Sequence, residues 1–161
     1  MAQKDAVRFL AQTPEELEFK RIRGSDEDIH ALYQLLQLRE NNISHVAMPS
    51  LAEHYRFVKN HPYRFWYLVK KKKTPIGSIY FHFDNSIGVS IPRQSSSVIA
   101  TALRRAVFLH RPLRAKKSVR SDQFYINSSP ENHQLRRALR LIGWKVLQVS
   151  YAAPKDTKTG G

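Results

Sequence analysis

The stretch INSSPENHQLRRALRLIGWKV, residues 126–146, contributes most to the fold prediction. A short β-like run ends at Asn127, and a Ser-Ser-Pro-Glu turn leads into a helix. Apolar residues recur in that helix at the spacing of one face, at Leu135, Ala138, Leu139 and Ile142. Gly143 is the expected end of the helix, because a positive φ costs glycine little, and an aromatic residue opens the next run. The stretch therefore predicts a helix between two strands.

A second junction, SIPRQSSSVIA at residues 90–100, has a similar design. A strand is expected to stop at Pro92, and a serine-rich turn then leads into a mostly buried helix. Unpaired N–H groups at a helix N-terminus form a site for anions, and the helix dipole strengthens it. Serines are small enough for a phosphate to approach, and Arg93 adds positive charge. An ordinary serine N-cap explains the same residues, so both interpretations stay open at this point.

The remaining segments give the order β-α-α-β-β-β-α-β-α-β. Alternating patterns predict strands within residues 17–24, 64–69, 74–83, 85–92, 118–127 and 144–152, with a charged turn at Lys70 to Lys73 between the second and the third. Helices are predicted after Ser25 and after the capping box formed by Ser50 and Glu53, and the second of these should end near His61. Helices that lie between strands in the chain imply crossover connections. The order therefore predicts an α/β fold, with a mixed, twisted, mostly antiparallel sheet flanked by about four helices.

Composition predicts one domain over residues 17–153, with an N-terminal extension at 1–16 and a flexible tail at 154–161. A chain of 161 residues can bury a hydrophobic core without disulfide bonds or a structural metal ion. It has no cysteine, which excludes disulfides and a cysteine nucleophile. No apolar run reaches the roughly 20 residues of a membrane span, and no signal-peptide core begins the chain. We therefore expect a soluble cytoplasmic protein without a membrane partner.

The chain is strongly basic, with a formal net charge of +14. Such a surplus favours anionic partners: nucleotide cofactors, phosphorylated substrates, nucleic acid or acidic proteins. A merely solubilising surface would have the same composition. The seven histidines are scattered without an HxxxH or HExxH pair, so no metal site is expected. The motifs of P-loop NTPases, Rossmann enzymes and serine hydrolases are also missing.

Together, the two junctions resemble the GNAT superfamily of acyl-CoA-dependent N-acetyltransferases, over residues 17–152. Asn132 stands in the family's asparagine position, apolar residues follow it at the expected places, and Ile142-Gly143-Trp144 replaces the family's Leu-Gly-Phe. The segments EHYRFVKNHPYRFWYLV and PIGSIYF are also similar to members that acetylate amino-sugars. This resemblance implies a GNAT-like sheet with a splayed pair of central strands, at residues 88–91 and 118–127.

The resemblance also implies acetyl-CoA as co-substrate. A backbone N–H near Val89 to Ile91 would polarise the thioester carbonyl. The serine-rich turn at Arg93 to Val98 would hold the diphosphate. Nucleotide phosphate would lie near Arg104, Arg105, Lys116 or Lys117. The implied cofactor-binding residues are Val89, Ile91, Arg93, Gln94, Ser95, Ser96, Ser97, Val98, Asn127 and Asn132.

Two positions depart from the family pattern. The phosphate turn lacks glycines, so serine Cβ atoms lie where phosphate meets bare backbone. The tyrosine that protonates the leaving thiolate falls at Leu139, which leaves Tyr125 or a water for this role. For the general base, the sequence offers Glu53 and His54. The residues expected to bind the acceptor are Arg39, His45, Tyr63 and Trp66.

The leading hypothesis is therefore an N-acetyltransferase that moves an acetyl group to a primary amine. The acceptor is expected to be anionic: an amino-sugar nucleotide, a protein or an aminoacyl-tRNA. The alternative is a catalytically inactive GNAT-shaped basic module that binds nucleic acid or a protein partner. The missing glycines, Leu139 and the high charge all favour this alternative. A homodimer is a further expectation.

Overall fold

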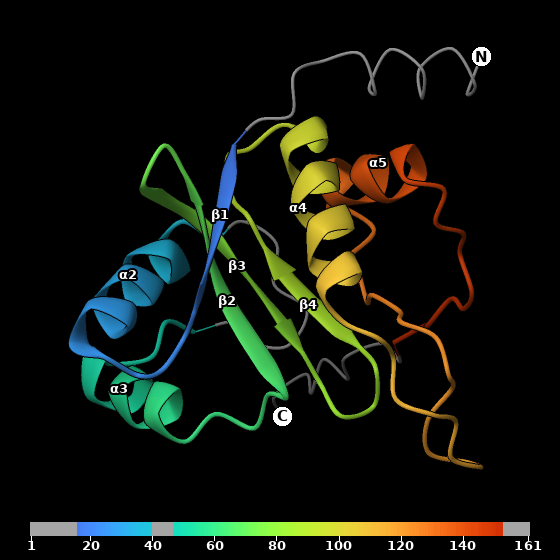
Figure 1. Ribbon diagram of the computed structural model, residues 1–161, viewed down its shortest axis with the longest axis horizontal. Coiled ribbons are helices and arrows are strands. Elements are labelled where there is room, and N and C mark those ends of the chain that lie inside the picture. The colour runs from blue at the N-terminus through green and yellow to red at the C-terminus, as the bar shows by residue number, and fades with distance from the viewer. Residues whose placement is uncertain (1–15, 40–46, 153–161) are drawn as a thin grey trace, which may run out of the picture.

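The four strands of the described residues form one open antiparallel sheet in the order β1-β2-β3-β4. The computed structural model describes residues 16–39 and 47–152, so His45 and nearly all of the predicted extension and tail lie outside them. α2 and α3 lie on one face of the sheet, and α4 and α5 on the other (Figure 1). The elements are β1 (Leu17–Arg21), α2 (Asp26–Gln37), α3 (Leu51–Lys59), β2 (Phe65–Lys71), β3 (Thr74–Phe81), β4 (Ile87–Ser90), α4 (Ser96–Leu109) and α5 (His133–Leu141). The prediction of an α/β fold with about four helices is confirmed for this part of the chain.

The register of the sheet places alternate side chains on opposite faces. Leu68 lies opposite Ser78, and Ile79 lies opposite Val89. Between β2 and β3 the turn consists of Lys72 and Lys73, both with positive φ, as a two-residue hairpin of type I′ requires. The charged turn predicted at residues 70–73 is therefore in the right place but is shorter, because Lys70 and Lys71 belong to β2.

Two apolar clusters cover the two faces. The larger one packs β3 and β4 against the last two helices, and its fully buried members include Ile79, Phe81, Ala100, Leu103 and Ala138. The smaller one packs β2 against the first two helices through Leu68, Ile29, Leu32 and Val58. On α5, the residues that the i, i+3, i+4 spacing predicts to face the core, Leu135, Ala138, Leu139 and Ile142, all belong to or pack against the larger cluster.

Serine caps begin the first two described helices, as predicted. Ser25 and Ser50 each form a capping box with the residue three positions later. In the first box the partner, Asp28, is buried and also accepts a hydrogen bond from Arg23 N–H at 3.0 Å. Burial alone would raise the pKa of Asp28, but this bond and Lys20, 3.0 Å away, lower it below its ordinary value. The turn from β1 into α2 is therefore closed around an ionised carboxylate.

Two predicted strands do not form. Residues 118–127 join the sheet only through an isolated parallel bridge between Tyr125 and Ser86, and a second, antiparallel bridge links Arg120 to Lys116 outside the sheet. Residues 144–152 are irregular and, after the half-buried Trp144, exposed. In the second segment Val146 is 81% exposed and Tyr151 93% exposed. A strand needs a neighbouring strand that pairs with its N–H and C=O groups. Because residues 118–127 are not themselves a strand, residues 144–152 cannot pair with them. The ladders of the sheet are accordingly all antiparallel instead of mixed.

No helix in residues 16–39 or 47–152 has the length and apolar character that a membrane span requires.

Partly buried histidines predict how stability depends on pH. Burial lowers the pKa of His54, His61 and His110 below their ordinary value of 6.5, and nearby arginines add to the effect at the last two. As pH falls, the unfolded chain therefore binds protons before the folded chain does, so the free energy of unfolding should fall below about pH 6.5. Urea denaturation between pH 7 and pH 5 measures this. His110→Gln should make the free energy of unfolding less dependent on pH. A wild-type free energy of unfolding that is constant between pH 7 and pH 5 would contradict the prediction.

Candidate active site

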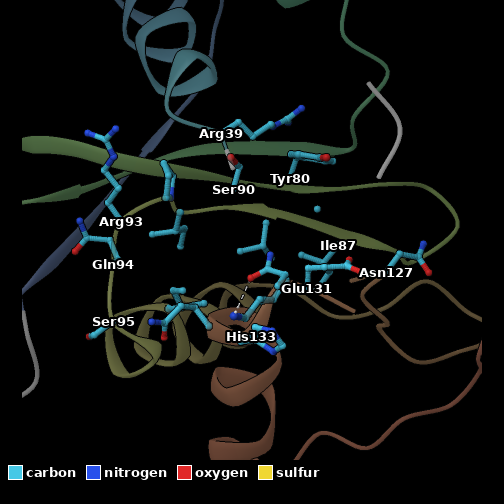
Figure 2. A pocket seen from close by; sticks show the side chains of 18 of the residues that line it. Arg39, Tyr80, Ile87, Ser90, Arg93, Gln94, Ser95, Asn127, Glu131 and His133 are labelled. Carbon is cyan, nitrogen blue, oxygen red and sulfur yellow. Dashed lines mark hydrogen bonds between the residues drawn. The ribbon is translucent and has the colours of Figure 1, made fainter. Parts of the chain in front are cut away.

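A cleft of about 930 Å³ opens along the free edge of β4 (Figure 2). β3 and β4 form one wall, and the starts of α4 and α5 form the other. Figure 2 shows Arg39 and Tyr80 on the first side, with Glu131 and His133 across from them. The lining residues that the sequence predicted are Arg39, Val89, Ile91, Arg93, Gln94, Ser95, Asn127 and Asn132.

The cleft exists because two chain segments separate. Ile87 N–H donates a hydrogen bond to Tyr125 O at 2.9 Å, and Tyr125 N–H donates to Asn85 O at 3.3 Å. Beyond this contact no ladder continues between the two segments. Because Ile87 N–H points away from β3, the two-residue period of a strand directs the Val89 and Ile91 N–H groups to the same open edge. Main-chain donors therefore face the cleft.

At one end of the cleft lies the N-terminus of α4. Ser95 is its N-cap and accepts a hydrogen bond from Val98 N–H at 3.4 Å. The N–H groups of Ser96 and Ser97 come before the first intrahelical bond, so they and the helix dipole give this end partial positive charge. Arg93 precedes them with φ of 56°. The Ser96 and Ser97 N–H groups are therefore the donors that an anion at this end of α4 would meet.

The three serines of this turn have different roles. Ser96 is buried and donates to Gln134 Oε1 at 2.5 Å, which ties α4 to α5. The Ser97 hydroxyl shares a hydrogen bond with the Ser95 hydroxyl at 2.8 Å. Val98 is buried in the core. Of these four predicted cofactor-binding residues, only Ser95 lines the cleft.

Aromatic side chains on β3, directly after it and in the loop before β2 build the wall opposite α4. The Tyr80 ring lies directly on Gly88, where a Cβ would be 1.9 Å from Tyr80 Cζ. Tyr63 stacks on Tyr80 with ring centroids 4.2 Å apart, and His82 contacts Tyr63 edge-on at 4.9 Å. Burial raises the pKa of Tyr63 far above its ordinary value, so its hydroxyl stays protonated. Tyr63 supports this wall from behind Tyr80 and is not one of the lining residues.

The α5 side of the cleft carries polar groups. Asn132 caps α5 by accepting Leu135 N–H at 3.1 Å, so its Oδ1 is engaged. The Ser129 hydroxyl donates to the Glu131 carboxylate and lowers its pKa below the ordinary value. Leu139, at the position of the family's tyrosine, is half-buried against the core and does not line the cleft.

The residues predicted for proton transfer lie elsewhere. Glu53 closes the capping box of α3, with its carboxylate 2.8 Å from Ser50 N. His54 is buried and its Nε2–H donates to Ile29 O at 3.1 Å. The Tyr125 hydroxyl donates to Asp84 at 2.9 Å and lines a second, smaller cavity. Trp66, expected at the acceptor, is buried among the rings around Tyr63. The structure brings none of these four side chains to the cleft.

Sequence reasoning missed several residues that do line it: Tyr80, His82, Glu131 and His133. Two signals could have found them. Tyr80 and His82 are two positions apart at the end of a predicted strand, so they point to the same face. Glu131 and His133 flank Asn132, which the sequence did single out.

Comparisons with known proteins give no match: no family profile, no curated protein and no solved structure is significantly similar to this chain. Among residues 16–39 and 47–152, no three metal-ligating side chains lie close enough together to bind an ion.

Proposed function

We propose that this protein is a GNAT-type N-acetyltransferase that transfers an acetyl group from acetyl-CoA to a primary amine on an anionic acceptor. The observation that carries the proposal is the cleft at the free edge of β4, which joins main-chain donors to the N-terminus of a buried helix. Its volume of about 930 Å³ is in the range of small-molecule sites.

The residues present fit the cofactor. The Arg93 side chain, Gln94, Ser95 and the first amides of α4 would hold the diphosphate, because they supply positive charge and N–H donors. The exposed edge of β4 would pair with the amides of the pantetheine arm. Asn127 also lines the cleft and can donate to the same arm. When bound, acetyl-CoA supplies the acetyl group as an activated thioester.

Three groups of the chain would then act on the reactants. The Val89 N–H at the open edge can donate to a carbonyl oxygen that gains negative charge, and such a donor is worth about 3–4 kcal/mol in other enzymes. His82 can take a proton from the acceptor's ammonium group as a general base, which leaves the neutral amine to attack the thioester carbonyl. As the C–N bond forms the C–S bond breaks, and the departing thiolate can take up a proton through water. Arg39 on the same wall favours an anionic acceptor. No enzyme nucleophile is required.

The proposal predicts that acetyl-CoA stabilises the protein. At a hundred times its Kd, a ligand adds about 2.7 kcal/mol, which for a chain of this size raises Tm by roughly 5–10 °C. Ser97→Glu should remove this shift, because the added carboxylate repels the diphosphate. The variant itself should remain stable, since an acid in the first turn suits the helix dipole.

Ala52→Glu is the matched control, because it adds the same charge to the first turn of α3, which contributes no residue to the cleft. It should keep the full thermal shift. If wild-type protein shows no shift with acetyl-CoA, the proposed function is wrong. If Ser97→Glu keeps the shift, the diphosphate is not held at α4. Binding without release of free thiol from acetyl-CoA, over a panel of anionic amines, would favour the inactive module that Leu139 suggests.

A further inference from the structure

Residues 113–121 form a loop that one buried side chain fastens at both ends; we call it the basic loop. Asn85 is fully buried. Its Nδ2 donates to Leu113 O at 2.8 Å and to Ser121 O at 2.7 Å, and its Oδ1 accepts Leu113 N–H at 2.7 Å. Both donors of this amide, and its oxygen, are used to close the loop.

Arg120 braces the loop from inside. Its Nε donates to Arg114 O at 2.9 Å and one terminal nitrogen donates to Phe83 O at 2.8 Å. The backbones of Lys116 and Arg120 exchange two hydrogen bonds of 2.9 Å. Nevertheless, residues 114–119 are all exposed. The contacts therefore fix the shape of the loop although the loop buries no apolar core of its own.

The remaining cations of this region have no carboxylate partner. Ion pairs found within the described part of the chain all involve Lys20 or Lys70. Arg111, Arg114, Lys116 and Lys117 thus present free positive charge, and no acid occurs between residues 104 and 121. In Figure 1 the loop projects from the lower right of the molecule, on the far side from the β2–β3 turn.

One exposed aromatic residue contacts the basic loop, and a second precedes the loop on α4. Phe83, whose carbonyl accepts the Arg120 bond, is 60% exposed. Phe108, near the end of α4, is 90% exposed and lies one helical turn from Arg104 on the same face. Cations that follow a phosphate backbone, together with rings on which bases stack, are the chemistry of single-strand binding.

We propose that the basic loop, with Phe83, Phe108 and Arg111, binds single-stranded nucleic acid without sequence preference. Because the loop is already held in shape, little ordering entropy is lost on binding. Residues 111–120 contain no Asn, Gln, Asp or Glu, the side chains that pair with the edges of adenine and cytosine. No residue of the basic loop lines the cleft, so the proposal does not require acetyl transfer, although Lys116 and Lys117 are also among the cations expected near the cofactor's nucleotide phosphate.

The test is the fluorescence anisotropy of labelled oligo(dT) and oligo(U) of about 20 nucleotides, with the full chain. Four phosphate contacts predict that log K falls with log salt concentration with a slope of about −2.8. Lys116→Glu with Lys117→Glu should halve that slope and weaken binding about tenfold or more at low salt. The control, Lys72→Glu with Lys73→Glu, makes the same charge change in the β2–β3 turn and should bind nearly as tightly as wild type.

Three results would overturn the proposal. Equal losses in the two double variants would show that net charge alone attracts the strand. No binding at low salt would exclude the surface. Loop-dependent binding to vesicles of anionic phospholipid, without binding to either oligonucleotide, would assign the loop to a membrane surface instead. Thermal unfolding of both variants confirms that the comparison is between folded proteins.

Discussion

Gly77→Ala is expected to lower the free energy of unfolding by about 3 kcal/mol and to abolish ligand binding in the cleft. A Cβ at this position would lie 2.4 Å from Ser90 O and 2.7 Å from Ile91 Cα. Both are backbone atoms at the end of β4, so no side chain can rotate to make room. The clash must move β4 away from β3, and β4 carries the main-chain groups that face the cleft.

Gly143→Ala is the control for this change. Its φ of 82° also disfavours alanine, but a Cβ there would meet no atom within 4 Å. Its cost should therefore be only the strain of the backbone, about 1–2 kcal/mol. Urea denaturation compares the two variants, and the thermal shift with acetyl-CoA reports on the cleft. If Gly77→Ala is no less stable than Gly143→Ala, the close approach of β3 and β4 does not constrain this position.

Asn85→Ala is expected to cost about 3 kcal/mol or more. The substitution removes three hydrogen bonds, each worth about 1 kcal/mol, and leaves alanine at a φ of 71°. Because these bonds close the basic loop, the loop should become mobile while all of its cations remain. Urea denaturation measures the first effect, and hydrogen exchange at the Leu113 amide measures the second.

Asn85→Gly separates the two causes, because glycine accepts the positive φ without strain. It should recover about 1 kcal/mol relative to alanine but should not restore slow exchange at Leu113. Under the proposal for the basic loop, this variant should also weaken oligonucleotide binding without a change in charge. Wild-type exchange at Leu113 in Asn85→Gly would show that the side chain does not hold the loop.

The local parts of the fold could be predicted because their signals lie within a few residues. Ser25, Ser50 and Ser95 mark helix starts through hydrogen bonds to N–H groups three positions away. Asn132 does the same for α5. The apolar, β-branched and aromatic residues of β2 and β3 likewise marked two strands around a charged turn. These interactions are short in sequence, so the residues themselves contain the information.

The site was predicted only in part, because only some of its features are local in sequence. Val89 and Arg93, which the sequence singled out, line the cleft, and a strand end beside a helix start is a feature that the local sequence shows. Glu53 and His54 were chosen by chemical type, yet one is used in a cap and the other is buried under α2. Which side chains converge depends on contacts between segments far apart in the chain.

The sequence by itself determined the helices, their caps, the hairpins of the sheet, the absence of disulfides and the strong positive charge. Only the tertiary structure decided that residues 118–127 leave the sheet after one contact, and that Asn85 holds residues 113 and 121 together. The physical reason is that a strand or a loop closure needs a partner distant in sequence. Alternation and propensity describe one segment, whereas hydrogen bonds between segments decide whether that segment finds its edge.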